Sequence, residues 1–65
     1  ARPAVDAAAV KQALTLGNFH FNRGEYADAI AEYERGLAAD RGNTELSSAV
    51  QRARVAKQAE DRVLQ

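Results

Sequence analysis

The sequence of 65 residues predicts an all-α fold built as a single domain of three antiparallel helices. Apolar residues recur at steps of three and four along most of the chain, which is the spacing of one face of a helix. Two polar, glycine-containing segments, "NRGE" and "DRGNTE", interrupt this pattern and divide the chain into three parts. No segment alternates with period two, so we expect no strands in residues 1–65.

The first helix is expected to run from about Pro3 to Arg23, a length of about 20 residues. Pro3 suits the first turn of a helix, where its missing N–H leaves no bond unmade, and Asp6 then lies near the positive end of the helix dipole. Gly24 can adopt the left-handed conformation that ends a helix. The core-facing stripe consists of Val5, Ala9, Ala13, Leu16 and His20.

The second helix is expected from about Glu25 to Ala39. As after the first helix, a polar segment with a glycine follows it. Gly42 is the expected stop, and Asn43 or Thr44 is the expected N-cap of the next helix. The apolar stripe of this helix is formed by Tyr26, Ala29, Ile30, Tyr33 and Leu37.

The third helix is expected from Glu45 to about Leu64, with a thinner apolar stripe and a largely charged end. Lys57 and Asp61 stand four residues apart, a spacing at which opposite charges attract on the surface of a helix. The stripe consists of Leu46, Val50, Ala53, Ala56 and Val63.

The helix lengths predict overhangs at opposite ends of the domain. The first and third helices would each span about 30 Å and the second about 21 Å, at 1.5 Å per residue. The exposed ends would be solvated and frayed, or would contact another chain. In the second case we expect an antiparallel or head-to-tail homodimer. The residues concerned are Val5, Ala8 and Ala9 at one end, Val63 and Leu64 at the other, and a close-packing seam of Ala49, Ala56 and Val63 at seven-residue spacing.

One set of residues has the spacing of a known repeat: Leu16, Gly17, Gly24, Tyr26, Ala29, Tyr33 and Leu37. This pattern resembles the tetratricopeptide repeat, a helix-turn-helix unit of about 34 residues. One unit would run from Val10 to Asn43, and residues 44–65 resemble the capping helix that covers the last repeat of such arrays. The resemblance implies an αα-hairpin that forms one element of a right-handed superhelix; a generic αα-hairpin is the alternative.

Each matched residue has a packing reason. Gly17 would lie where the two helices of the unit cross, with Ala29 as its small counterpart on the second helix. Tyr26 would pack over the turn, and Tyr33 with Leu37 would present the face on which the third helix docks. Together these residues specify an antiparallel pair of helices.

The chain also departs from the repeat pattern at four positions. Ala13 replaces a large aromatic residue, which we expect to thin the core. Gly36 replaces alanine and is expected to weaken the second helix by up to about 1 kcal/mol. The other two departures are His20 in place of tyrosine and Arg41 in place of proline.

The resemblance implies a binding surface on the first helix, because ligand peptides lie against this concave face in the family. The expected partner is therefore a protein: a peptide or a partner helix. The alternative role is structural, as a terminal cap or a homodimerisation element of a larger protein. Capture of a C-terminal carboxylate is not expected, since Asn18 matches one residue of that clamp but Leu14 replaces its lysine. The expected contact residues are Lys11, Leu14, Asn18, Phe21 and Asn22.

Catalysis, metal binding and cofactor binding are not expected from the residue pattern. His20 is the single histidine and there is no cysteine, too few ligands for a histidine-based zinc site. Glu32 and Glu34 would point to different faces of their helix, so they do not form an acid and base pair. The glycines do not follow a strand, as a phosphate-binding loop would require.

The charge balance argues against nucleic acid and membranes as partners. Nine basic residues balance nine acidic ones, and the segment Glu25 to Asp40 is acidic, which would repel phosphates. Apolar runs are far shorter than the roughly 20 residues that span a bilayer. With no initiator methionine, the chain is expected to be a piece of a longer protein. The compartment is not identified, although the lack of cysteine slightly favours the cytoplasm.

Overall fold

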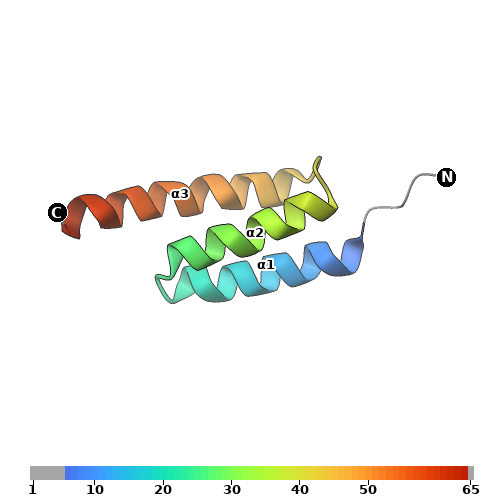
Figure 1. Cartoon of the computed structure of the whole chain (residues 1–65), viewed down its shortest axis with the longest axis horizontal. Helices are drawn as coiled ribbons and strands as arrows, with labels where there is room; N and C mark the ends of the chain where they lie inside the picture. Colours follow the sequence, from blue (N-terminus) through green and yellow to red (C-terminus); the bar gives the residue numbers. More distant parts are fainter. Residues whose placement is uncertain (1–5, 65) are drawn as a thin grey trace.

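The computed structural model describes residues 6–64, which form three α-helices: α1 (Ala7–Asn22), α2 (Tyr26–Ala39) and α3 (Thr44–Leu64). The helices run antiparallel, with α2 between α1 and α3 (Figure 1). The predicted all-α fold is confirmed, and residues 6–64 contain no strand. None of these three helices is long and apolar enough to cross a lipid bilayer.

Helix α1 begins later than the sequence pattern suggested. Asp6 is extended, with φ −85° and ψ 92°, and its side chain accepts a hydrogen bond from the Ala9 N–H at 3.1 Å. Asp6 is therefore the N-cap, and not a residue inside the first turn. The helix has 16 residues instead of about 20, and the predicted role of Pro3 lies outside the described residues.

The turn between α1 and α2 depends on Gly24. Its φ of +79° is the one positive φ among residues 6–64, so the predicted left-handed helix stop is confirmed. The Gly24 N–H donates to the Phe21 carbonyl, and the Glu25 N–H donates to the His20 carbonyl at 2.9 Å. These bonds satisfy carbonyls at the end of α1 that have no partner within the helix.

The turn between α2 and α3 is closed by polar side chains. Asn43 is the N-cap of α3, because its Oδ1 accepts a hydrogen bond from the Leu46 N–H at 2.8 Å. Its Nδ2 donates to Asp40, the residue directly after α2. Gly42 has no positive φ, so its predicted role as the helix stop is wrong.

Helices α1 and α2 approach closely at Gly17, as predicted, but the residue opposite is different. A Cβ at Gly17 would lie 2.8 Å from Tyr33 Cζ and even nearer to two other carbons of the same ring. Tyr33, rather than Ala29, is therefore the counterpart of Gly17. The ring fills the space that a missing side chain leaves, and Tyr33 is 1% exposed as a result.

Gly36 occupies a second close approach, at the centre of the domain. A Cβ there would lie 2.8 Å from Leu46 Cδ1 on α3 and closer still to Ala13 Cβ on α1. Both neighbours are buried. The small residues at positions 13 and 36 thus let α2 approach both other helices, which offsets the thin core expected from Ala13 and explains glycine at position 36.

The core is small and ends before α3 does. Its largest fully buried side chains are Tyr33 and Leu46, and the last buried residue of α3 is Ala53. Helix α3 has 21 residues against 14 in α2, so its C-terminal part projects beyond the turn between α1 and α2 (Figure 1). The radius of gyration of 12.7 Å exceeds the roughly 11 Å of a compact chain of this length. The buried core comprises Ala13, Ala29, Tyr33, Leu46, Ala49, Val50 and Ala53.

The C-terminal overhang of the third helix is therefore present, whereas the N-terminal overhang of the first is largely lost. With 16 residues, α1 is only slightly longer than α2, and Val5 lies outside the described residues. The expected pair on α3 is confirmed: Lys57 Nζ donates to Asp61 Oδ2 at 2.8 Å.

Candidate functional site

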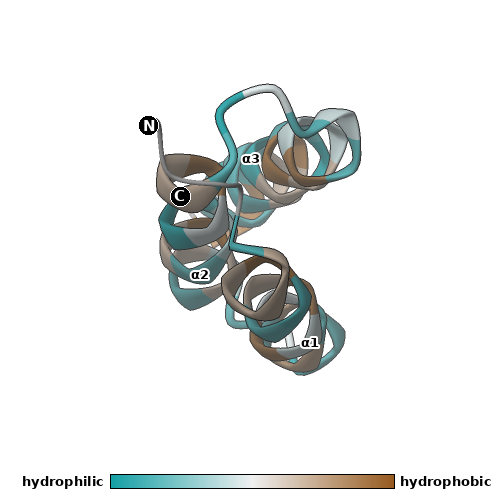
Figure 2. Ribbon diagram, turned by 90° about the vertical axis from the view of Figure 1, so that its right-hand side faces the viewer, coloured by the Kyte–Doolittle hydropathy of each residue, from teal (hydrophilic) through white to brown (hydrophobic). Residues whose placement is uncertain are grey.

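An apolar groove runs between α1 and α3, with the start of α2 at its base. Viewed along the helices, α1 and α3 pack on different sides of α2 and lean away from each other (Figure 2). A hollow of about 420 Å³ lies between them and is lined by Phe21, Gln51, Arg52, Val55 and Ala56. Helices that flank a third without packing closely on each other leave apolar side chains open to solvent.

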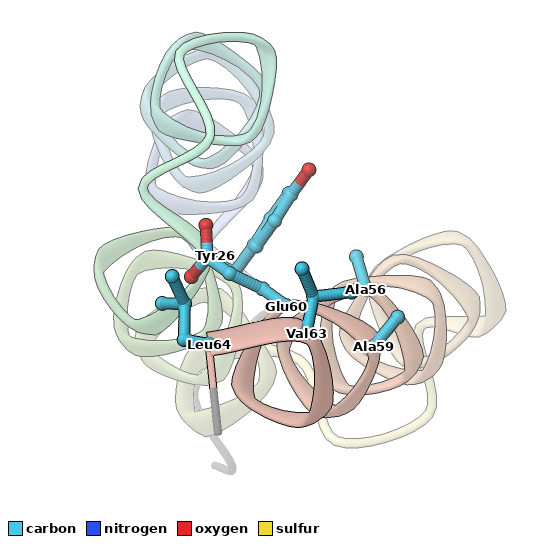
Figure 3. A pocket seen from close by; sticks show the side chains of 6 residues that line it. All are labelled: Tyr26, Ala56, Ala59, Glu60, Val63 and Leu64. Atoms are coloured by element: carbon cyan, nitrogen blue, oxygen red, sulfur yellow. The ribbon is translucent and has the colours of Figure 1, made fainter.

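A second hollow of about 450 Å³ continues the groove toward the end of α3. It shares Ala56 with the first, so the two form one surface, which we call the α1–α3 groove. Ala56, Ala59 and Val63 project from the same side of α3 beside Tyr26 (Figure 3). The second hollow is lined by Tyr26, Ala56, Ala59, Glu60, Val63 and Leu64.

The aromatic side of the groove is positioned by the turn between α1 and α2. Phe21 is in the last turn of α1 and Tyr26 is the first residue of α2. Their rings meet edge to face, with centroids 5.2 Å apart, which is a favoured arrangement for aromatic pairs. The tight turn at Gly24 brings the two rings together and so fixes one wall of the groove.

A polar contact links α1 to α2 next to Gly17. The buried Tyr33 hydroxyl donates a hydrogen bond to Asn18 Oδ1. Burial raises the pKa of the Tyr33 hydroxyl above its usual 10.0, an effect that the nearby positive charge of Arg52 opposes. Tyr33 therefore stays protonated and able to donate at neutral pH. Because the Asn18 oxygen is committed to this bond, Asn18 serves the fold as well as the surface.

The five contact residues expected on the first helix differ in exposure and in their relation to the groove. Lys11, Asn18 and Asn22 are exposed, whereas Leu14 and Phe21 are partly buried and pack against the core. Phe21 lines the α1–α3 groove, and the other four are not among the residues that line its two hollows. Four of the five residues that line the first hollow come from α3.

The contribution of Val55 and Ala59 on α3 to the groove was missed because this helix carries two apolar faces. One face, from Leu46 to Ala53, is buried against α2. The other comprises Val55, Ala59 and Val63, which recur every four residues and so share a side of the helix. This spacing is visible in the sequence, although the predicted apolar stripe of the helix contained only Val63 of these three residues.

The structure supports only part of the predicted self-association seam of Ala49, Ala56 and Val63. Ala49 is 1% exposed and belongs to the core, because α3 turns that side toward α2; its place in a seam between chains is wrong. Ala56 and Val63 do line the groove, and Val63 is 84% exposed. The available surface of α3 thus begins beside the buried face, at Gln51 and Arg52, and continues beyond it to Leu64.

A cluster of His20, Glu25 and Asp28 lies at the turn between α1 and α2, with potential metal-ligand atoms within 4.8 Å of one another. The Glu25 carboxylate accepts hydrogen bonds from His20 Nδ1 at 2.7 Å and from Arg23 Nε at 3.3 Å. Glu25 also precedes α2, and Asp28 lies in its first turn, where the helix dipole favours carboxylates and disfavours a cation. We therefore interpret the cluster as a polar contact that links the end of α1 to the start of α2, and not as a metal site.

These contacts predict a pH dependence of stability at Glu25. Hydrogen bonds from His20 and then Arg23 hold the pKa of Glu25 below its ordinary value of 4.5. The folded state thus favours the ionised form, which stabilises the fold above the unfolded-state pKa and loses this contribution as the pH falls through the lower folded value. We expect Glu25→Gln to be less stable than the wild type at pH 7, and the two to converge in acid. Urea denaturation at both pH values measures this, and a difference that persists or grows in acid would contradict it.

No protein-family model, curated protein or solved structure matches the chain. The resemblance to tetratricopeptide repeats therefore depends on the residue pattern and its packing reasons.

Proposed function

We propose that the chain is a protein-interaction module of the tetratricopeptide type that receives a peptide or a partner helix in the α1–α3 groove. The supporting observation is the continuity of the apolar surface from Phe21 and Tyr26 along α3 to Leu64. The turn between α1 and α2 fixes one wall of this surface, so little ordering is needed on binding.

The dimensions of the groove favour a helical segment over a small molecule. Both hollows are shallow and open to solvent, whereas small-molecule sites enclose most of the ligand surface. From Gln51 to Leu64, α3 offers about 20 Å of length, which corresponds to about 13 residues of helix. An amphipathic helix that lays its apolar side into such a groove is an established mode of recognition.

Val55→Glu tests this proposal with little disturbance of the fold. Val55 lines the groove and is 65% exposed, so a charge there should leave the core intact. Ala31→Glu is the matched control, since it adds the same side chain at an exposed position on α2 that does not line the groove. Both variants should keep the circular dichroism of the wild type. Asn18→Ala would be a less specific probe, because it also removes the acceptor of the Tyr33 hydrogen bond.

The measurement is selection of displayed peptides on the immobilised wild-type chain, followed by titration of a selected peptide. We expect Val55→Glu to weaken binding by about tenfold or more, since it buries a charge in an apolar contact. Ala31→Glu should bind as the wild type does. Equal affinities for the two variants, or chemical-shift changes on the α2 surface around Ala31, would contradict the proposal.

A further inference from the structure

We infer that the helix received by the α1–α3 groove is α3 of a second copy of this chain, in an antiparallel homodimer. This inference rests on the proposed function and names the occupant of the same groove.

The first observation is the concentration of exposed apolar side chains on the second half of α3. Three of the four large exposed hydrophobic residues within residues 6–64 lie there: Val55 at 65%, Val63 at 84% and Leu64 at 78%. Ala56 and Ala59 lie between them on the groove side. Small residues allow the axes of two helices to approach closely, with the larger side chains packing around them. This segment therefore has the composition of a helix-helix contact.

The second observation is the placement of charge along the same segment. Arg52 and Glu60 are exposed groove residues on either side of Val55, Ala56 and Ala59, eight residues or about 12 Å apart. Arg52 and Glu60 form no ion pair within residues 6–64. By contrast, the neighbouring Arg54 pairs with Glu34, and Lys57 pairs with Asp61. The groove side of α3 thus carries one positive and one negative side chain that remain available to a partner.

These charges select an antiparallel second copy. With the two α3 helices antiparallel and centred near Ala56 and Ala59, each Arg52 lies within about one turn of the Glu60 on the other copy. The same pair forms twice, as the two-fold symmetry of a homodimer requires. A parallel copy would instead place like charges together. The contact differs from the seam predicted from seven-residue spacing, since Ala49 is buried and the centre moves toward the end of α3.

Sedimentation equilibrium of the full chain tests the inference, from about 10 μM to about 1 mM, the affinity range suited to a small interface. We expect a reversible equilibrium between the 7.0 kDa monomer and a dimer. Arg52→Glu and Glu60→Arg should each weaken the dimer by about tenfold, because two attractive pairs become repulsive. The double variant Arg52→Glu with Glu60→Arg restores both pairs and should restore the dimer. Ala31→Glu is again the control and should dimerise as the wild type does.

The outcomes separate this inference from the proposed function. A chain that stays monomeric but binds selected peptides in a Val55-dependent way overturns the homodimer and leaves the proposed function in place. A dimer that is unaffected by Val55→Glu overturns the groove as its interface. A dimer that both single charge reversals weaken but the double variant does not restore overturns the antiparallel pairing. Rescue by the double variant supports it.

Discussion

Replacing Gly17 with alanine is expected to destabilise the domain by about 2 kcal/mol, although the same change in an ordinary helix is stabilising by about 0.5–1 kcal/mol. The added Cβ would overlap three carbons of the Tyr33 ring, the farthest of them at 2.8 Å. The ring cannot rotate away freely, because it is 1% exposed and its hydroxyl is hydrogen-bonded to Asn18. The steric cost therefore exceeds the gain in helix propensity.

Urea denaturation followed by far-ultraviolet circular dichroism measures this change. Gly42→Ala is the matched control, because a Cβ at Gly42 meets no atom within 4 Å and its φ is not positive. The control should be as stable as the wild type, or slightly more stable because alanine restricts the unfolded chain. If Gly17→Ala were at least as stable as the wild type, Tyr33 would have to move without cost and the tight crossing would be refuted.

The three helices could be predicted because their signals are local. Gly24 and Asn43 act through the conformation or hydrogen bonds of their own turns, so their roles depend little on the rest of the fold. The beginning of α1 was predicted too early, because Pro3 is typical of a first helical turn and Asp6 was interpreted as a charge near the helix dipole, not as the N-cap. The hydrogen bond from Ala9 to Asp6 decides it, and a pattern of residue types does not contain that bond.

The counterpart of Gly17 could not be predicted, because it depends on how the two helices are rotated about their axes. A small residue opposite a small residue is the simplest arrangement, and it indicated Ala29. The structure instead inserts the Tyr33 ring at that point. This ring accounts for two features at once, the close approach at Gly17 and the hydrogen bond to Asn18.

The groove was only half predicted, for a similar reason. Phe21 was expected on a binding surface, and Ala56 and Val63 were expected in a contact between chains; all three line the groove. Val55 and Ala59 also line it but were not predicted to belong to any contact surface. The side of α3 that stays exposed to solvent depends on how α3 packs against α2, which begins at Tyr26. It also depends on the angle between α1 and α3 (Figure 2). Both are properties of the assembled fold. The spacing of apolar residues in the sequence predicts which sides of a helix are apolar, but not which of those sides is buried.

Leu46→Ala is expected to destabilise the domain by about 3 kcal/mol, the typical cost of removing a fully buried leucine side chain. Leu46 is fully buried in the first turn of α3, and its Cδ1 packs against the backbone of α2 at Gly36. A domain of this size has a total stability of about 3–10 kcal/mol, so the loss removes about a third or more of it, and at the lower end of this range a large fraction of the variant is unfolded at 25 °C. Denaturant melts give the loss directly.

Leu64→Ala provides the matched control, the same substitution in the same helix at a residue that is 78% exposed. At low micromolar concentration it should change the free energy of unfolding by less than about 0.5 kcal/mol. Comparing the two variants isolates the effect of burial, because alanine and leucine differ only slightly in helix propensity.

The Leu46→Ala variant also tests whether α3 is an integral part of the domain. Tyr33 on α2 belongs to the same buried cluster as Leu46, and its ring in turn packs on Gly17 of α1. If this chain of contacts makes folding cooperative, amide protection should fall in all three helices together, as in a two-state domain. Protection that falls in α3 alone would show that α1 and α2 fold as an independent hairpin. Cooperative loss would show that the α1–α3 groove exists only when α3 is docked, so that every ligand of the groove also stabilises the fold.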